Sequence, residues 1–298
     1  MTKKKSHLIT LLSLLLLPAL MTAFASCKSD CIGTALTTDS IKIENNEDSL
    51  ATASLVFDYP TEGRPKMLDS VRAYINETLY HCFYPGENGK SKYAELYKGD
   101  LESGKKVGKF YGKAFAEEMK QMRHADGMDK TSAPYSHYLT LRKVEDTDFF
   151  TSYVLHNYWY TGGAHGSDFT EGATISKFDG HVLSYPIDTL RLMDIQPLLA
   201  QGIADYLNTA KQWDDNITAK NIRDYLFLSG DTIPLPAARP YLTAKGIMMV
   251  YQQYEIGPYA MGQPSFVIPY DKVMPFLTKD AKSVITPMLE IEKKENKK

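Results

Sequence analysis

The sequence predicts an α+β fold, with a largely antiparallel sheet, helices packed on it and two small α/β subdomains. Two observations support this class. Strand-like segments follow one another directly after residue 135, joined by tight turns, and segments with helical periodicity are grouped together. Strands in succession with helices grouped beside them favour α+β over a doubly wound parallel sheet. We therefore expect subdomains over residues 51–145 and 146–280, followed by a charged tail over 281–298.

The first subdomain is expected to contain one strand and two helices. Residues 53–59 (ASLVFDY) have the composition of a strand. Asp69 can cap a helix that runs to about residue 80, and a second helix is expected over 110–123. The first of these helices has an apolar stripe at helical spacing, which indicates a buried face. This stripe comprises Leu68, Val71, Ile75, Leu79 and Cys82.

The second subdomain is expected to contain most of the strands. Asp179-Gly180 is a strong signal for a hairpin turn, and Lys245-Gly246 turns between two later strands. Apolar periodicity indicates helices between these groups of strands. The expected strands are 136–144, 149–160, 168–177, 181–185, 241–243, 246–252 and 265–268, and the expected helices are 195–207, 219–228 and 271–277.

The N-terminus has the pattern of an export signal. Three lysines precede a Leu-rich run over residues 8–20, which is shorter than the ~20 residues that span a bilayer. Ala23-Phe24-Ala25 fits ordinary signal peptidase, whereas Phe24-Ala25-Ser26-Cys27 resembles a bacterial lipobox, and we favour the lipobox. This predicts a signal peptide over 1–26, a lipid anchor on Cys27 and a flexible tether over 27–50. The protein would be exported and lipid-anchored to the bacterial cell envelope, at the outer membrane or the periplasmic face.

The charge of the chain excludes nucleic acids as partners. Removal of residues 1–26 leaves 272 of the 298 residues and takes away three lysines, which changes the formal net charge from −2 to −5. Nucleic-acid binding needs a concentrated basic face, and the lysines of this chain are scattered. With Cys27 lipidated, Cys31 and Cys82 remain, but Cys82 lies on the apolar helix stripe. It is expected to be a buried small hydrophobe, so a disulfide between these two cysteines is not favoured.

The segment 160–166 (YTGGAHG) joins three glycines and a histidine directly after an aromatic strand. Its spacing matches neither a phosphate-binding loop nor a nucleophile elbow. A metal site formed by His156, His165, Asp168 and His181 is not favoured, because no zinc-type spacing is present, and we expect neither metal nor cofactor. The strand before the loop is aromatic or apolar on both alternating faces. His156, in its middle, is therefore expected to be a hydrogen-bonded core histidine.

A second cluster lies at residues 251–262 (YQQYEIGPYAMG). Pro258 and two glycines fix a loop there. Tyr254 and Tyr259 can offer flat faces to a sugar ring or to an apolar side chain of a protein partner. The alternative is that these tyrosines pack against the edge of the sheet.

The two clusters together carry a specific resemblance. NYWYTGGAHG, followed about ninety residues later by YEIGPYAMG and then FVIPY, resembles the extracytoplasmic C-terminal domain shared by RsiV-type lysozyme-sensing anti-sigma factors and PdaC-type peptidoglycan deacetylases. The resemblance covers roughly residues 152–279, and residues 51–145 resemble loosely the smaller α/β domain that precedes it. It implies that the two clusters lie close together. The sigma-binding segment, the transmembrane helix and the deacetylase domain of those families are not expected here.

We therefore expect a non-enzymatic envelope lipoprotein that binds a lysozyme-like protein or a cell-wall glycan. The rival hypothesis is a cell-wall polysaccharide hydrolase or deacetylase, with Glu255 as general acid/base, His165 as its partner or a metal ligand, and Asp168 or Glu171 as second carboxylate. In a third interpretation both clusters are structural, and His165 bonds a backbone carbonyl. The candidate binding residues are Tyr160, Gly162, Gly163, His165, Tyr254, Glu255 and Tyr259.

Overall fold

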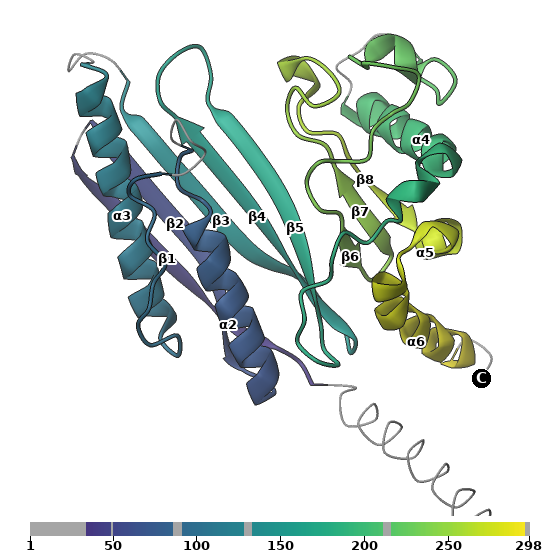
Figure 1. The fold of residues 1–298 in the computed structure, drawn as a ribbon, viewed down its shortest axis with the longest axis horizontal. Coiled ribbons are helices and arrows are strands. Elements are labelled where there is room, and N and C mark those ends of the chain that lie inside the picture. Colours follow the sequence, from purple (N-terminus) through teal and green to yellow (C-terminus); the bar gives the residue numbers. More distant parts are fainter. Residues whose placement is uncertain (1–33, 49, 86–90, 128–132, 211–215, 296–298) are drawn as a thin grey trace, which may run out of the picture.

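The protein has the predicted α+β fold, with helices packed on two sheets (Figure 1). The computed structural model describes residues 34–48, 50–85, 91–127, 133–210 and 216–295. The predicted signal peptide, the lipidation of Cys27 and the state of Cys31 concern residues outside these ranges. None of the helices in the described ranges has the length and hydropathy that a bilayer crossing requires.

The larger sheet has the strand order β1-β2-β3-β4-β5. Strands β2 and β3 are parallel, because the chain crosses between them through two helices that cover one face of the sheet (Figure 1). The other neighbours are antiparallel, as predicted. The elements are β1 (Thr37–Asp48), β2 (Ala51–Glu62), α2 (Pro65–Tyr80), α3 (Gly104–Ala125), β3 (Tyr135–Asp146), β4 (Phe150–Tyr160) and β5 (Ser167–Ser176).

Both helices begin earlier than the sequence patterns indicate. Helix α2 starts at Pro65 with Arg64 as N-cap, since proline lacks the N–H that the first turn leaves unpaired, so Asp69 lies inside the helix. Helix α3 starts after Ser103, whose hydroxyl accepts a hydrogen bond from the backbone N–H of Lys106. The predicted apolar stripe on α2 is correct at Val71, Ile75 and Leu79, which are fully buried, and Cys82 is a buried free thiol.

The predicted tether over 27–50 is wrong for residues 37–48, which form the edge strand β1. Ile41 and Ile43 alternate with charged residues and turn toward α3, where Gly108 and Gly112 allow close approach. The chain before β1 is also held. The ammonium of Lys177 donates to the carbonyl of Thr34 at 3.0 Å and pairs with Asp146 at 2.7 Å. The carboxylate of Asp146 in turn accepts from the N–H of Leu36 at 3.0 Å.

The predicted boundary between subdomains near residue 145 is also wrong. It falls between β3 and β4, which pair along their whole length in one sheet. The larger unit instead runs to the end of β5, because strands β4 and β5 complete the sheet on which α2 and α3 pack. The smaller unit begins after the turn at Asp179-Gly180.

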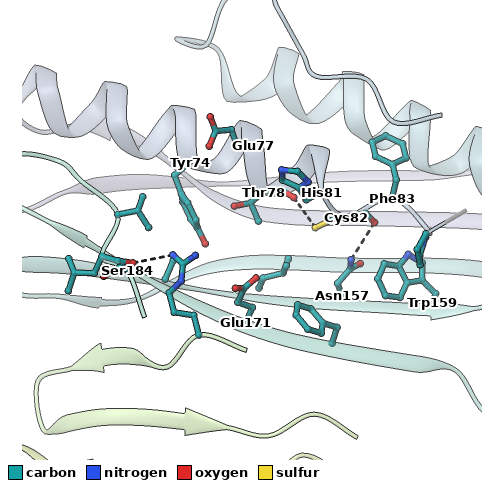
Figure 2. Close-up of a pocket in the computed structure, with 17 residues that line it drawn as sticks. Tyr74, Glu77, Thr78, His81, Cys82, Phe83, Asn157, Trp159, Glu171 and Ser184 are labelled. Carbon is teal, nitrogen blue, oxygen red and sulfur yellow. Dashed lines mark hydrogen bonds between the residues drawn. The ribbon is translucent and has the colours of Figure 1, made fainter. Parts of the chain in front are cut away.

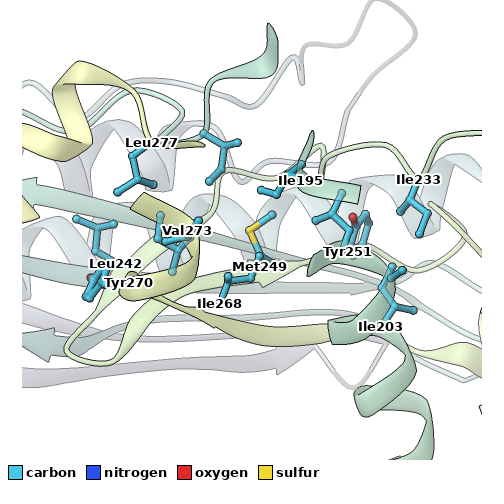
Figure 3. Packing of buried hydrophobic residues seen from close by; sticks show 14 of the residues in the cluster. Ile195, Ile203, Ile233, Leu242, Met249, Tyr251, Ile268, Tyr270, Val273 and Leu277 are labelled. Atoms are coloured by element: carbon cyan, nitrogen blue, oxygen red, sulfur yellow. The ribbon is translucent and has the colours of Figure 1, made fainter. Parts of the chain in front are cut away.

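The smaller unit is a three-stranded antiparallel sheet, β6-β7-β8, covered by helices (Figure 1). Its core contains apolar residues of the helices and of all three strands, including Ile195, Met249 and Val273 (Figure 3). The elements are η1 (Thr189–Arg191), α4 (Leu192–Ala210), η2 (Ile222–Tyr225), β6 (Tyr241–Thr243), β7 (Gly246–Val250), η3 (Tyr259–Met261), β8 (Ser265–Pro269), α5 (Tyr270–Val273), η4 (Met274–Phe276) and α6 (Lys279–Glu295).

Three predictions for this region are corrected. The expected helix over 219–228 is the single 3₁₀ turn η2, and the expected strand over 181–185 is an isolated bridge at Val182. Most of the expected charged tail over 281–298 belongs to α6, because apolar residues recur at helical spacing within it. These buried residues are Ala281, Val284, Ile285 and Met288.

Helix α6 is tied to the turn after β5 by a histidine between two carboxylates. His181 contacts Asp179 through Nδ1 at 2.6 Å and Asp280 through Nε2 at 2.8 Å. Burial lowers the pKa of His181, but these hydrogen bonds outweigh it and raise the pKa above its ordinary value. Burial raises the pKa of the two aspartates, and the bonds to His181 and to nearby backbone or hydroxyl groups bring both below their ordinary values.

The two sheets meet through both apolar and polar groups. The Ser152 hydroxyl on β4 donates to the Leu242 carbonyl on β6 at 2.7 Å, and the Leu242 N–H donates to the Thr174 hydroxyl at 2.9 Å. Gly172 lies against the ring of Tyr241, and a Cβ atom there would come within 2.0 Å of it. The smaller sheet covers this face of β4 incompletely. His156 is therefore exposed, with its Nδ1 2.9 Å from the Thr170 hydroxyl, and the prediction of a core histidine is wrong.

Candidate functional site

The loop between β4 and β5 contains the histidine cluster. Gly162 and Gly163 have φ angles of 97° and 89°, in the left-handed region that favours glycine. The Tyr160 hydroxyl donates to the Gly163 carbonyl at 3.0 Å and closes the loop. A Cβ atom on Gly166 would lie 2.4 Å from the Tyr158 ring. The three glycines thus shape a tight loop that projects His165 into solvent.

The second cluster begins with a turn over residues 252–255, in which the Glu255 N–H donates to the Gln252 carbonyl at 3.2 Å. Tyr254 occupies the third position of this turn with a φ of 65°, the one positive φ of a non-glycine residue in the described part of the chain. The Glu255 carboxylate accepts from the N–H groups of Gln252 and Ala237, both at 2.7 Å. These bonds hold the strained turn, and Tyr254 stays 60% exposed.

The two clusters meet at His165, as the resemblance implied. The His165 ring stacks on Tyr259, with centroids 3.9 Å apart and an interplanar angle of 21°. The Tyr254 hydroxyl lies 3.2 Å from Nε2 of His165. His165 Nδ1 lies 3.0 Å from the Gly166 carbonyl, which can only accept, so Nδ1 carries the proton of the neutral ring. Nε2 then accepts from Tyr254, and the phenol oxygen of Tyr254 keeps its lone pairs for a ligand.

Two tyrosines of the sheet extend this ring cluster. Tyr138 on β3 and Tyr158 on β4 are cross-strand partners that stack at 6.0 Å with an interplanar angle of 20°. Tyr138 is 48% exposed. Gly166, the residue after His165, lies against the Tyr158 ring, so Tyr158 borders the loop that carries His165. Burial raises the pKa of Tyr158, and the hydroxyl of Tyr259 raises it further. We call Tyr138, Tyr158, His165, Tyr254 and Tyr259 the aromatic site.

Amides hold the second cluster on β5. The Gln252 side chain accepts from the N–H of Thr170 at 2.9 Å and donates to its carbonyl at 2.8 Å. The Gln263 side chain contacts the Thr170 hydroxyl at 2.8 Å and donates to the carbonyl of Asp168 at 3.2 Å. Bonds of this kind fix the register of the two loops, which positions the rings before any ligand binds.

Among the described residues, no hydrogen bond or ion pair joins His165 to any of the carboxylates of the rival hydrolase hypothesis. Both oxygens of Glu255 accept backbone N–H groups, and no hydrogen bond or ion pair joins Glu255 to His165 among the described residues. Burial raises the pKa of Glu255, and those two N–H donors oppose the rise. Asp168 is half-buried near His156, and burial raises its pKa. Glu171 lines a cavity on the opposite face of the larger sheet.

The described residues contain no group of three or more His, Cys, Asp or Glu side chains arranged to hold a metal ion. Of the four residues considered for such a site, His156 bonds Thr170 and His165 contacts Tyr254. His181 instead lies between Asp179 and Asp280 at the start of α6.

Comparison with known proteins identifies two families that match this chain. The family described as "Deacetylase PdaC" matches residues 65–168, and the family described as "Protein of unknown function (DUF3298)" matches residues 195–271. This chain has the PdaC/DUF3298 domain pair. The resemblance read from the sequence is therefore confirmed, and the pair indicates a cell-envelope protein. The histidine loop lies at the end of the PdaC match, whereas Tyr254 and Tyr259 lie in the DUF3298 match, so the aromatic site is built from both domains.

Two of the solved structures that match share the fold over most of the chain. A DUF3298 family member from Bacteroides fragilis is 22% identical, with a TM-score of 0.58 over 84% of this chain and 96% of that one. A DUF3298 family protein from Pseudomonas aeruginosa PAO1 is 17% identical, with a TM-score of 0.53 over 83% and 96%. At these identities the likeness shows the fold alone. No curated protein matches the chain.

Sequence analysis missed several residues that build the site. Tyr138 and Tyr158 were not among the candidates, although the alternation of each strand places both on the face that carries Tyr160. The signal was therefore present in β4, but the pairing of β3 with β4 was needed to read it. Gln252 and Gln263 carry no sequence signal of their positioning role.

Proposed function

We propose that this PdaC/DUF3298-type protein is an exported, Cys27-anchored lipoprotein that binds cell-wall glycan at the aromatic site. The observation that carries the proposal is the group of partly exposed rings that two distant loops and two strands assemble. Ring faces carry negative partial charge and attract the C–H groups of a sugar ring, while the phenol hydroxyls can bond sugar hydroxyls.

The surroundings of the site favour a neutral, hydroxyl-rich ligand. On this face of β2 and β3, the neighbours of Tyr138 are Thr52, whose hydroxyl lies 3.5 Å from the Tyr138 hydroxyl, Ser54 and Ser136. The nearest carboxylate described above, Asp168, is half-buried. Charged partner surfaces would gain little here, because few opposite charges are available to pair with them.

The geometry supports binding rather than hydrolysis. A retaining or inverting glycosidase needs two carboxyl groups on either side of the scissile bond. Glu255 uses both oxygens to hold the turn that carries Tyr254, and Glu171 lies on the other face of the sheet. The imidazole of His165 contacts the Gly166 carbonyl and the Tyr254 hydroxyl, and it orients tyrosines instead of a carboxylate.

The proposal is tested by titrating the purified mature protein with soluble peptidoglycan fragments and with N-acetylglucosamine oligomers, using calorimetry or NMR. We expect binding to the wild type and a loss of about fivefold in affinity for each of Tyr138→Ala and Tyr259→Ala, since a stacked ring contributes about 1 kcal/mol. Tyr93→Ala, a half-buried tyrosine on the helix side of the larger sheet, is the matched control.

Four outcomes would contradict the proposal. One is no glycan binding by the wild type, and another is equal affinity in the ring variants and the control. Tight binding of lysozyme without glycan binding would instead favour a protein partner. Release of shortened glycans or acetate during the titration would restore the enzyme hypothesis. The anchor is tested separately, by mass spectrometry of the mature N-terminus from membrane extracts.

A further inference from the structure

A cavity of about 680 Å³ lies on the opposite face of the larger sheet from the aromatic site, between α2 and strands β4 and β5 (Figure 2). Its volume is in the range of small-molecule sites in proteins. Leu155, Phe169 and Ala173 of the sheet and Val182 beyond it supply apolar walls. Glu77 of α2 and His81, the residue that follows the helix, are exposed and lie where the cavity meets solvent.

Glu171 gives the cavity a carboxylate without a partner. It lies on β5, paired with Leu155, and its side chain points into the space between the sheet and α2 (Figure 2). Within the described ranges, no hydrogen bond or ion pair joins this carboxylate to another group. A half-buried carboxylate in apolar surroundings gains substantially from a cationic partner.

Arg239 gives the same cavity a guanidinium that is largely free. It donates one hydrogen bond, from Nη1 to the carbonyl of Leu183 at 3.2 Å, and no carboxylate of the described chain pairs with it. Glu171 and Arg239 both line this cavity, together with Tyr74. Burial raises the pKa of the Tyr74 hydroxyl, Glu171 adds to the rise and Arg239 opposes it, which agrees with this placement.

Two opposite charges that share a cavity without pairing suit a ligand with two opposite charges of its own. A simple anion would be repelled by Glu171 and Glu77, and an apolar ligand would take water from Glu171 and Arg239 without replacing it. We propose that the cavity binds a zwitterion of amino-acid or short-peptide size, with its ammonium group at Glu171, its carboxylate at Arg239 and its side chains on the apolar wall.

This site is independent of the proposed glycan site. It is tested by calorimetric titration of the full mature protein with Ala-Ala, Ala-Leu and trialanine, and with the same peptides carrying an N-acetyl or a C-amide block. We expect either block to reduce affinity for the wild type by about tenfold or more, because a charge-assisted hydrogen bond is lost.

The variants test the placement of each terminus. In Glu171→Gln, free and N-acetylated peptides should bind equally, while the C-amide block should still reduce affinity. In Arg239→Gln the pattern should be reversed, which a general loss of folding cannot produce. Glu62→Gln, an exposed carboxylate at the end of β2, and Tyr254→Ala at the aromatic site should bind as the wild type does.

The proposal is overturned if no peptide binds the wild type at millimolar concentration. It is also overturned if blocked and free peptides bind with equal affinity, or if both variants lose affinity for every peptide alike. Loss of peptide binding in Tyr254→Ala would place the ligand at the aromatic site and would likewise contradict the cavity.

Discussion

The backbone strain at Tyr254 can be tested by comparing two variants, because the protein with glycine at this position should be more stable than the protein with alanine. Its φ of 65° lies in the left-handed region, at the turn position where glycine is preferred. A residue with a Cβ atom is less stable there by about 1–2 kcal/mol. Glycine itself lowers the free energy of unfolding by about 0.5–1 kcal/mol relative to alanine, because the unfolded chain has more conformational entropy with glycine. Tyr254→Gly should therefore be more stable than Tyr254→Ala by about 0.5–1 kcal/mol.

Both variants remove the same 60% exposed ring, so the lost ring contacts cancel in the comparison. The assay is urea unfolding followed by circular dichroism, with equal slopes required before free energies are compared. Lys113, exposed in the middle of α3, is the control position. There the order should be reversed, and glycine should be less stable than alanine by about 1 kcal/mol.

An alanine variant at Tyr254 as stable as the glycine variant would refute the backbone strain. Both variants should also lose glycan affinity to the same degree, because each lacks the ring that His165 orients. If Tyr254→Gly is more stable than Tyr254→Ala but binds glycan weakly, the strained turn is retained because it presents the Tyr254 ring to the ligand.

Two further predictions concern the frame around the sites. His181→Asn should lower stability most between about pH 4 and 6.5, where the aspartates are charged and the histidine holds its proton. Because these groups are partly exposed, the loss of stability in the variant should be about 1 kcal/mol or less. The loss should vanish as the pH rises through the raised pKa of His181, or falls through the lowered pKa of the two aspartates. A difference in melting temperature that stays constant from pH 5 to 9 would contradict this prediction. Gly246→Ala should cost about 1–3 kcal/mol in urea unfolding, because a Cβ atom would lie 2.2 Å from a backbone oxygen of β8, whereas Gly230→Ala, with no atom within 4 Å, should be near neutral.

Local patterns predicted the elements whose apolar residues are dense or regularly spaced. The stripe on α2 follows from helical periodicity, the strands β3 to β5 follow from their strand-like composition, and the strand over 241–243 was correct to the residue. Only two isoleucines mark the buried face of β1, which hid it among polar residues. The apolar positions of α6 were likewise diluted by lysine and glutamate, although their helical spacing is regular.

What depends on pairing between distant segments could not be read in this way. The boundary near residue 145 seemed natural because β3 ends there, yet β4 returns to the same sheet. His156 was assigned to the core because both faces of its strand are aromatic or apolar, whereas the smaller sheet leaves that end of β4 open. The meeting of the two loops came from the resemblance, and Tyr138 came from strand register alone.

The clamp formed by Lys177 and Asp146 has a consequence for how the molecule faces its surroundings. It fixes Thr34 beside the C-terminal end of β5. The loop that carries His165 lies at the other end of this strand, just before its first residue. The ten residues of β5 separate these two ends by about 30 Å. A lipid on Cys27 would be joined to Thr34 by seven residues, which reach about 25 Å at full extension. The end of β5 next to Thr34 would then stay near the bilayer, and the aromatic site at the other end of the strand would face outward, toward the cell wall.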